Sequence, residues 1–254
     1  MTSGGAGATM RQKMLTGRHK GGTPMDIHGL QKLTLLDYPG KVACTVFLGG
    51  CDFRCPFCHN GELVAGPLPP PETDDKALLA FLNKRRGLLD GVCVTGGEPL
   101  LRPELPDLLA RIKELGFLVK VDTNGAHPDR LRALVERGLA DYVAMDVKNG
   151  PTRYAETAGV EDLDLAPIRD SVSFLLSGAA DYEFRTTVVR EFHGGDDLRE
   201  LGVWLAGAKR YFLQSFADRA TVLRPGLHPW GRAELEGLLA LVRQEGPAAE
   251  LRGV

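Results

Sequence analysis

Three cysteines lie close together in this chain: Cys51, Cys55 and Cys58 form a Cys-x3-Cys-x2-Cys run. Three thiolates on one short loop can bind three irons of an iron–sulfur cube, in which a fourth cysteine normally binds the fourth iron. No further cysteine follows at close spacing, so one iron would keep an open coordination position. Because metal centres do chemistry at open positions, the spacing predicts a cluster that binds another molecule at its fourth iron.

These cysteines could also form a disulfide or a zinc site. A disulfide with a spare thiol fits poorly, because five cysteines are an odd number and nothing in the sequence indicates export. A structural zinc site could use the three cysteines and His59, although the adjacent Cys58 and His59 would have difficulty reaching one ion. A zinc or iron–sulfur binding module without enzymatic activity is therefore the non-enzyme alternative.

The cysteine run resembles the signature of the radical S-adenosylmethionine (SAM) enzymes, Cys-x3-Cys-x-aromatic-Cys, with Phe57 as the aromatic residue. The resemblance implies that the three cysteines hold a [4Fe–4S] cluster and that SAM binds its open iron through the amino and carboxylate groups. It also implies reductive cleavage of SAM to a 5′-deoxyadenosyl radical, which abstracts a hydrogen atom. In such an enzyme the protein positions the cofactor and excludes competing reactions.

Short apolar runs alternate with helical patterns along most of the chain. The apolar runs predict strands at residues 42–48, 91–94, 117–121, 141–147, 182–189 and 211–215. Helical patterns follow at residues 73–85, 103–115, 128–137, 165–176, 196–208 and 233–244. This alternation indicates βαβ units with a parallel sheet. A barrel of eight units typically needs about 250 residues, so six units in 254 residues predict an α/β fold with a partial (βα)6 TIM-like barrel, which is also the fold the resemblance implies for a radical SAM core.

Composition narrows the class of protein. Residues 1–25 are rich in glycine, threonine and basic residues, which predicts a disordered tail, and residues 26–254 would form the radical SAM core domain with a C-terminal helix. A net charge of -2 gives no sign of a nucleic-acid-binding surface. No apolar run approaches the roughly 18 residues that cross a membrane. Free cysteines without an export signal favour the reducing cytoplasm.

Polar motifs follow several of the predicted strands, and ligands of parallel α/β proteins bind at the carboxyl ends of strands. The first motif is Gly96-Gly97-Glu98-Pro99, which could simply be a tight turn before a helix. Glycines allow a close approach of the backbone, and a carboxylate can pair with an ammonium group. The motif resembles the GGEP motif of radical SAM enzymes, which implies that Glu98 and the backbone near Gly96 and Gly97 hold the amino group of SAM.

Two further motifs follow later strands. The Asp-Thr-Asn-Gly segment that begins at Asp122 could be an Asx turn, and Asp146 with Lys148 could form a weak surface ion pair. Both segments resemble those of activating enzymes for glycyl-radical proteins. The resemblance places Asp122, Thr123 and Asp146 near the methionine end of SAM, in one case around a monovalent cation, and it implies that Lys148 contacts the SAM carboxylate.

The last two strands each offer one polar candidate. Arg185 begins an otherwise apolar run and could form a salt bridge across the barrel mouth; the resemblance implies a contact with SAM or with a substrate loop. Gln214 ends the last predicted strand and is a weaker candidate for the SAM ribose or carboxylate. Cys44 and Cys93 lie within apolar strands and are expected to be small core residues.

The resemblance is closest at residues 33–64, which are similar to the longer form of anaerobic ribonucleoside-triphosphate reductase activating proteins. It implies an external electron donor such as flavodoxin and a glycyl radical formed on the reductase. No cysteine lies between Cys58 and Cys93, which excludes activases with inserted cluster domains. A pyruvate formate-lyase-type activase and a small-molecule radical SAM enzyme remain alternatives, and the chain departs from the expected pattern from Ala217 onward.

Overall fold

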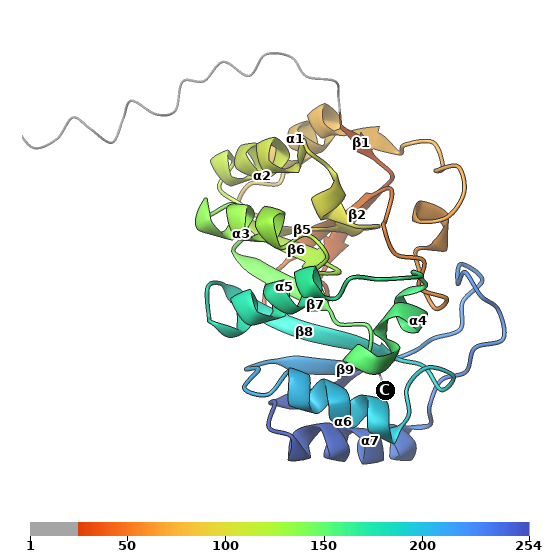
Figure 1. Ribbon diagram of the computed structural model, residues 1–254. Helices are drawn as coiled ribbons and strands as arrows, with labels where there is room; N and C mark the ends of the chain where they lie inside the picture. The colour runs from red at the N-terminus through yellow and green to blue at the C-terminus, as the bar shows by residue number, and fades with distance from the viewer. Residues whose placement is uncertain (1–24, 254) are drawn as a thin grey trace, which may run out of the picture.

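The protein is described here by a computed structural model that covers residues 25–253. An eight-stranded sheet forms its centre, in the strand order β10-β9-β8-β7-β6-β5-β3-β2 (Figure 1). The strands are β2 (Gly29–Thr34), β3 (Ala43–Leu48), β5 (Gly91–Gly96), β6 (Leu118–Thr123), β7 (Tyr142–Asp146), β8 (Asp181–Val188), β9 (Tyr211–Ser215) and β10 (Ala249–Arg252). A separate antiparallel pair joins β1 (Asp26–Ile27) to β4 (Thr73–Asp74).

The six predicted strands are all present and lie side by side in parallel, from β3 through β5 to β9. A helix follows each of them: α1 (Asp75–Asn83), α2 (Leu105–Glu114), α3 (Pro128–Glu136), α5 (Ala166–Leu176), α6 (Gly195–Trp204) and α7 (Arg232–Gln244). The shorter pieces are α4 (Tyr154–Ala158), η1 (Gly61–Leu63), η2 (Pro99–Leu101) and η3 (Pro151–Arg153). The predicted α/β fold with a mostly parallel, TIM-like partial barrel is therefore confirmed.

Two strands of the central sheet, β2 and β10, escaped the sequence prediction, as did the short pair β1 and β4. Both β2 and β10 lie at the edges of the sheet. Antiparallel β2 precedes β3 and has mostly exposed or half-exposed residues. Parallel β10 has only four residues, Ala-Glu-Leu-Arg, and follows the last helix. An edge strand is not buried on both faces, so it lacks the continuous apolar run by which a central parallel strand is recognised.

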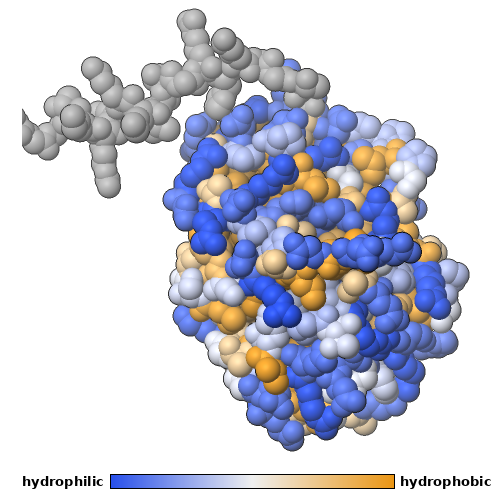
Figure 2. All heavy atoms as spheres, in the orientation of Figure 1, coloured by the Kyte–Doolittle hydropathy of each residue, from blue (hydrophilic) through white to orange (hydrophobic). Residues whose placement is uncertain are grey.

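Along each central strand, the side chains point alternately outward to the helices and inward to the barrel interior, and both positions are mostly buried. The outward side chains pack against the helices. Leu109 and Ile112 of α2, for example, belong to the main hydrophobic core. Their inward side chains include polar groups, among them Thr45 and Lys120, which are also buried. Hydrophilic residues cover most of the face seen in Figure 2, where hydrophobic residues appear only in small separate patches.

Two expectations from the sequence concern the predicted tail and membrane spans. The predicted tail, residues 1–25, lies outside the described residues except for Met25, which is buried and donates its backbone N–H to Asp75 Oδ1. Within residues 25–253 we find no helix that combines the length and the apolar character needed to cross a membrane.

Candidate active site

All of the predicted site residues line one cavity of about 380 Å³ at the carboxyl ends of the parallel strands. They are Cys51, Cys55, Phe57, Cys58, Gly96, Gly97, Glu98, Asp122, Thr123, Asp146, Lys148, Arg185 and Gln214. The cavity also contacts residues that the sequence prediction left out, among them Asn124 and Cys93. The side chains come from six different strands or strand ends, which a parallel barrel brings to one rim.

The cysteine loop connects β3 to η1 and is fixed by backbone hydrogen bonds. Gly50 N–H donates to Leu63 O at 2.7 Å, and Arg54 N–H donates to Ala158 O at 2.9 Å. Within the loop, Cys58 N–H donates to Cys55 O at 3.0 Å. The three thiols are free and face the same cavity, so the loop is held in shape by the backbone and not by cross-links between its cysteines.

Burial disfavours the charged form of all three thiols. It raises the pKa of Cys51 to about 12 and that of Cys55 to about 11, and it also raises the pKa of Cys58. The Lys148 ammonium opposes the rise at each of the three cysteines. Because metal is bound by thiolates, loading the site must release protons.

The arrangement of the thiols fits a cluster. In the described part of the chain, no three Cys, His, Asp or Glu side chains gather around a point that could hold a single metal ion. A cubane cluster requires a different arrangement, in which each thiolate reaches its own iron. Three free thiols on one loop that face one cavity are the donors that such a cluster uses.

Gly96 and Gly97 bring the end of β5 against the cysteine loop. Gly97 N–H donates to Leu48 O at 2.8 Å, and the next N–H, that of Glu98, donates to Gly50 O at 2.7 Å. A Cβ atom on Gly96 would collide with the Leu48 backbone and one on Gly97 with the Gly50 backbone, and Gly96 also has a φ of +122°. The glycines therefore allow two strand ends to meet, which is a structural role that the sequence did not reveal.

Glu98 is buried and accepts three hydrogen bonds. Its Oε1 accepts from Leu100 N–H at 3.0 Å and from Thr123 Oγ1 at 2.9 Å, and its Oε2 accepts from Asn124 N–H at 2.7 Å. Burial raises the pKa of Glu98 to about 7, although these hydrogen bonds oppose the rise. An ionised carboxylate can accept about four hydrogen bonds, so one position stays open for a donor in the cavity.

Asn124 is a site residue that the sequence reasoning treated only as part of a turn. Besides its contact with Glu98, its side-chain amide donates to Asp52 Oδ1 at 2.7 Å and lies 3.9 Å from the Cys51 sulfur. His127 Nε2 lies 3.0 Å from the other Asp52 oxygen. Asn124 therefore joins the strand-end turn to the cysteine loop, and the only signal in the sequence was its place in the Asp-Thr-Asn-Gly motif.

Five charged side chains of alternating sign form an ion-pair chain across the barrel interior, in the order Lys120, Asp122, Arg185, Asp146 and Lys148. Lys120 pairs with Asp122 Oδ1. Arg185 donates from Nη1 to Asp122 Oδ2 at 3.1 Å and from Nε to Asp146 Oδ1 at 2.8 Å. Lys148 completes the chain at 3.1 Å from Asp146 Oδ2. The salt-bridge alternative for Arg185 is thus what the structure contains, and Lys120 is a member that the sequence prediction omitted.

The ion-pair chain keeps all of its members ionised. Burial alone would raise the pKa of Asp122 and Asp146, but Arg185 and the neighbouring lysine outweigh it and hold both pKa values below the usual range. The same pairing outweighs burial at Lys120 and Lys148 and raises their pKa values. Three cations face two carboxylates, so the chain has one positive charge in excess, and it lies where a ligand carboxylate would be attracted.

The predicted monovalent cation near Asp122 and Asp146 stays a prediction. Each of these carboxylates already contacts two cationic side chains. A metal ion at this position would have to compete with Lys120, Arg185 or Lys148.

Cys93 and Cys44 differ in their surroundings. Cys44 is buried in the hydrophobic core, as predicted. Cys93 is equally buried, but it lines the cavity, and its thiol lies 3.6 Å from Lys120 Nζ and 3.7 Å from Asp122 Oδ1. Cys93 therefore belongs to the floor of the site, whereas Cys44 does not line it.

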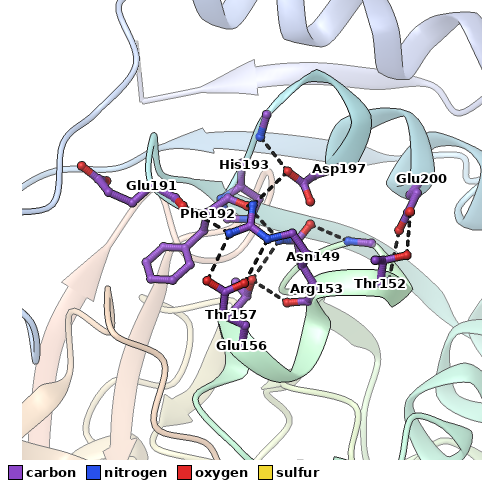
Figure 3. A network of polar contacts seen from close by, with 12 residues as sticks. Asn149, Thr152, Arg153, Glu156, Thr157, Glu191, Phe192, His193, Asp197 and Glu200 are labelled. Atoms are coloured by element: carbon purple, nitrogen blue, oxygen red, sulfur yellow. Dashed lines mark hydrogen bonds and ion pairs between the residues drawn. The ribbon is translucent and has the colours of Figure 1, made fainter.

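The backbone just after β7 is held by a polar network that includes Asn149 and His193 (Figure 3). His193 Nδ1 accepts from Val189 N–H at 3.1 Å, so Nε2 carries the proton and donates to Lys148 O at 2.8 Å. Burial lowers the pKa of His193, and its ring packs edge-on against Phe57 with centroids 6.1 Å apart. His193 thus links Lys148 to the cysteine loop, although the sequence assigned it no role.

The segment after β9 covers the cysteine loop. His59 stacks on Phe216 with ring centroids 5.6 Å apart, and its Nε2 lies 2.8 Å from Ala217 O. Further along, Arg224 N–H donates to Pro56 O at 2.9 Å. The region from Ala217 onward, where the chain departs from the expected sequence pattern, therefore contributes to holding the candidate cluster loop.

Comparisons with known proteins agree with this geometry. The radical SAM superfamily model matches residues 45–164. A putative glycyl-radical enzyme activating enzyme of Methanocaldococcus jannaschii is 29% identical over 211 residues, which is 76% of this chain and 80% of that protein. The pyruvate formate-lyase-activating enzyme of Clostridium pasteurianum is 34% identical over 127 residues, but the match spans only 48% of this chain and 52% of that protein.

Two further relatives match part of the chain. An anaerobic ribonucleoside-triphosphate reductase-activating protein of Salmonella typhi is 33% identical over 36% of this chain and 60% of its own. A 7-carboxy-7-deazaguanine synthase of Koribacter versatilis is 31% identical over 62% of this chain and 66% of its own. Among solved structures, QueE from Escherichia coli has the same fold, with a TM-score of 0.54, 17% identity and coverage of 91% of this chain and 95% of that one.

The fold, the cysteine run and these matches identify the chain as a radical SAM enzyme. It is homologous to activating enzymes of glycyl-radical proteins. The family implies a [4Fe–4S] cluster and SAM as cofactors, and the thiols and the charged cavity described above fit both.

Proposed function

We propose that this protein is a radical SAM activating enzyme that generates a glycyl radical on a partner protein, and that the partner is an anaerobic ribonucleoside-triphosphate reductase. An external reductant such as flavodoxin supplies the electron. Because its three thiols must stay reduced to bind iron, the reducing cytoplasm is the compartment that suits it. When bound, the cluster and SAM supply the 5′-deoxyadenosyl radical that removes a hydrogen atom from a backbone glycine.

The observation that carries the proposal is the gathering of three thiols, a buried carboxylate and an ion-pair chain with excess positive charge around one cavity. SAM has an ammonium group and a carboxylate on the same carbon. Glu98 has one acceptor position left for an ammonium group, and Lys148 has an ammonium at the cysteine side of the cavity for a carboxylate. The site therefore matches both charges of this ligand.

The remaining predicted residues have supporting parts in this proposal. Cys51, Cys55 and Cys58 hold the cluster, and Phe57 packs the loop against Phe192 with ring centroids 5.8 Å apart. Thr123 orients Glu98 by its hydrogen bond. Gln214, on the last strand before the covering segment, is available for the ribose or carboxylate of SAM.

The barrel is open, which suits a macromolecular substrate. Its terminal strands β2 and β10 do not pair with each other in the described sheet, so the rim can admit a loop of another protein. Three of the matched relatives are named as activating enzymes or activating proteins, and they support this class. The sequence similarity at residues 33–64 favours the reductase as the target.

Two alternatives keep specific support. A pyruvate formate-lyase-type activase is favoured by the 34% identity of the clostridial relative. A small-molecule radical SAM enzyme is favoured by the matched 7-carboxy-7-deazaguanine synthase, which is 31% identical over 62% of this chain. Each predicts a different acceptor of the radical.

The deciding experiment gives the reconstituted protein a choice of acceptors under anaerobic conditions. The protein, a reductant and SAM are mixed with the anaerobic reductase, with a pyruvate formate-lyase, or with neither. We expect 5′-deoxyadenosine and a glycyl-radical electron paramagnetic resonance signal with the reductase alone. SAM cleavage without a radical on either protein would overturn the activase proposal. Cys51→Ala should abolish both signals, whereas Cys44→Ala, which removes a thiol outside the cavity, should retain them.

A further inference from the structure

Arg54 lies inside the cysteine loop and folds its side chain back onto that loop. One guanidinium nitrogen, Nη1, donates to Cys51 O at 2.5 Å and to Phe53 O at 2.8 Å. Arginine stays charged in proteins and offers only donors, and hydrogen bonds from an ionised donor are among the stronger ones. One charged side chain therefore fixes two carbonyl groups in the segment between the first two cysteines.

The backbone of Arg54 is held by the end of α4. Arg54 N–H donates to Ala158 O at 2.9 Å. Gly159 follows the helix with a left-handed φ of +65°, and a Cβ atom on it would collide with Arg54 O. This close approach requires glycine, which has no side chain and adopts positive φ without strain. The peptide between Phe53 and Arg54 is thus bonded at both ends, by the guanidinium group and by α4.

Helix α4 is itself fixed, so the loop is bound to a firm support. In the network of Figure 3, Thr157 accepts from the Asn149 side-chain amide at 2.8 Å, and the same amide donates to Phe192 O at 3.0 Å. On the side of the loop, the buried ring of Tyr154 meets the ring of Phe53 edge-on, with centroids 6.4 Å apart. These contacts hold α4 and the cysteine loop as one packed unit.

These contacts decide where the Phe53 N–H points. It belongs to a peptide whose two neighbours along the chain both have their carbonyl oxygens bound by the Arg54 guanidinium group. Because peptide units are planar and the backbone rotates only between them, fixing both neighbours restricts the peptide in the middle. In that orientation Phe53 N–H donates to the Cys51 sulfur at 3.4 Å. The Asn124 amide lies farther from the same sulfur, at 3.9 Å.

We propose that Arg54 is a positioning residue for the cluster. Together with the end of α4, it holds the cysteine loop so that Phe53 N–H donates to the Cys51 thiolate, and this hydrogen bond raises the reduction potential of the bound cluster. An iron-bound thiolate carries negative charge and accepts a stronger hydrogen bond than a neutral thiol. The inference rests on the cluster of the proposed function, but it needs neither SAM cleavage nor a particular radical acceptor.

The direction of the effect follows from charge. Hydrogen bonds to cluster sulfurs help to set the potential, because they stabilise the reduced form, which carries one more electron. The Arg54 charge would act in the same direction without any hydrogen bond to sulfur, since a nearby cation also stabilises an added electron. The experiment must therefore separate the position of the loop from the charge of the arginine.

Two variants make this separation. Arg54→Met removes the charge and both carbonyl bonds, and because Arg54 is exposed, its replacement leaves no cavity in the core. Gly159→Ala keeps the charge but places a Cβ against Arg54 O. The matched controls are Arg232→Met, which removes an exposed arginine paired with Glu236, and Gly138→Ala, which changes a glycine with the same φ of +65° but open space around its Cβ.

The first measurement is amide hydrogen exchange in the metal-free protein, read at Phe53 and Arg54. We expect exchange at both amides to become at least about tenfold faster in Arg54→Met and in Gly159→Ala, and to stay unchanged in the two controls. Unchanged exchange in Arg54→Met would mean that the arginine does not hold the loop. That result would overturn the proposal, even if the variant bound no iron.

The second measurement is a potentiometric titration with dithionite and mediators, followed by electron paramagnetic resonance, on reconstituted proteins of equal iron content. We expect the equilibrium constant for one-electron reduction to fall about tenfold in Arg54→Met and in Gly159→Ala, a shift of about 59 mV to more negative potential, and to stay unchanged in the controls. A fall in Arg54→Met alone would assign the effect to charge and overturn the proposal. A fall in Gly159→Ala alone, or in neither variant, would overturn it as well.

The titration contains no SAM and no partner protein, so it separates this inference from the proposed function. A lowered potential in both variants of a protein that activates no glycyl-radical enzyme would support the positioning role of Arg54 and reject the activase proposal. A wild-type protein that binds no cluster would overturn both.

Discussion

Replacing Lys120 with methionine tests whether the ion-pair chain is a structural requirement of the barrel. The Lys120 side chain is 1% exposed, and its partner Asp122 is 13% exposed. Removing one partner of a buried pair costs about 3–5 kcal/mol, because the other charge stays buried. Arg185 still contacts Asp122 at 3.1 Å, so we expect the lower end of this range, about 3 kcal/mol. At about 2–4 °C per kcal/mol for a chain of this size, the melting temperature should fall by about 6–12 °C.

The pH dependence of this loss has a definite sign. In the folded protein the pKa of Asp122 is held below its usual value against the effect of burial. Its ionised form therefore contributes stability above the unfolded pKa of about 3.9, and that contribution is lost as the pH falls. Without Lys120 the contribution is smaller, so the deficit of Lys120→Met should be largest at neutral pH and should shrink as the pH falls through about 4.

Lys113→Met is the matched control, assayed by the same anaerobic urea and thermal unfolding of the metal-free protein. Lys113 also contacts an aspartate, Asp141, at 2.6 Å, but the two side chains are 27% and 28% exposed. An exposed pair contributes less than about 1 kcal/mol. The double variant Lys120→Met with Asp122→Asn should recover most of the loss, since no unpaired charge remains. Equal losses in the two single variants, or a deficit that grows as the pH falls, would refute the reasoning.

Three further predictions concern the site itself. Glu98→Gln should weaken SAM binding at least about tenfold, the equivalent of about 1.4 kcal/mol, in equilibrium binding to the reconstituted protein, and unchanged affinity would exclude an ammonium contact. Burial raises the pKa of Glu98 in the folded protein to about 7. The protonated carboxyl therefore stabilises the fold fully at pH values below the pKa of Glu98 in the unfolded chain, and this stability is lost as the pH rises through about 7. Denaturant titrations of Glu98→Gln should lack that decline. Gly97→Ala places a Cβ against the Gly50 backbone. It should lower the free energy of unfolding by about 1–3 kcal/mol and lower the iron content after reconstitution. The control Gly237→Ala, whose Cβ meets no atom within 4 Å, should do neither. Cys51→Ala should bind less iron and cleave no SAM, and a variant that still cleaves SAM would contradict the cluster assignment.

Much of this site could be predicted because its residues are local in the sequence and lie at equivalent places in the fold. The three cysteines share one loop, and Glu98, Asp122 and Asp146 each stand at or just after the end of a parallel strand. Parallel strands place their carboxyl ends at one rim, so recognising the six βα units was enough to bring these side chains together. Buried on both faces, the central strands are also recognisable by their continuous apolar runs.

Other members of the site depend on contacts between distant segments. Lys120 lies in an apolar run, and its only signal was its spacing of two from Asp122, which places both side chains on the same face of β6. Whether that face is the barrel interior is decided by packing against the helices. Similarly, Arg185 of β8 pairs with Asp146 of the neighbouring strand β7 and with Asp122 of β6, one strand further. No local sequence pattern specifies these partners.

The sequence by itself determined the type of chemistry, through the residue types and their spacing: a thiol loop, a Gly-Gly-Glu turn and charged strand ends. Only the tertiary structure decided how the charges are shared and that Gly96 and Gly97 allow two strand ends to meet. The physical reason is that spacing along the chain determines which groups a loop or strand can present. Burial and pairing, which set the charge and the hydrogen bonds of those groups, arise from contacts between residues far apart in the sequence.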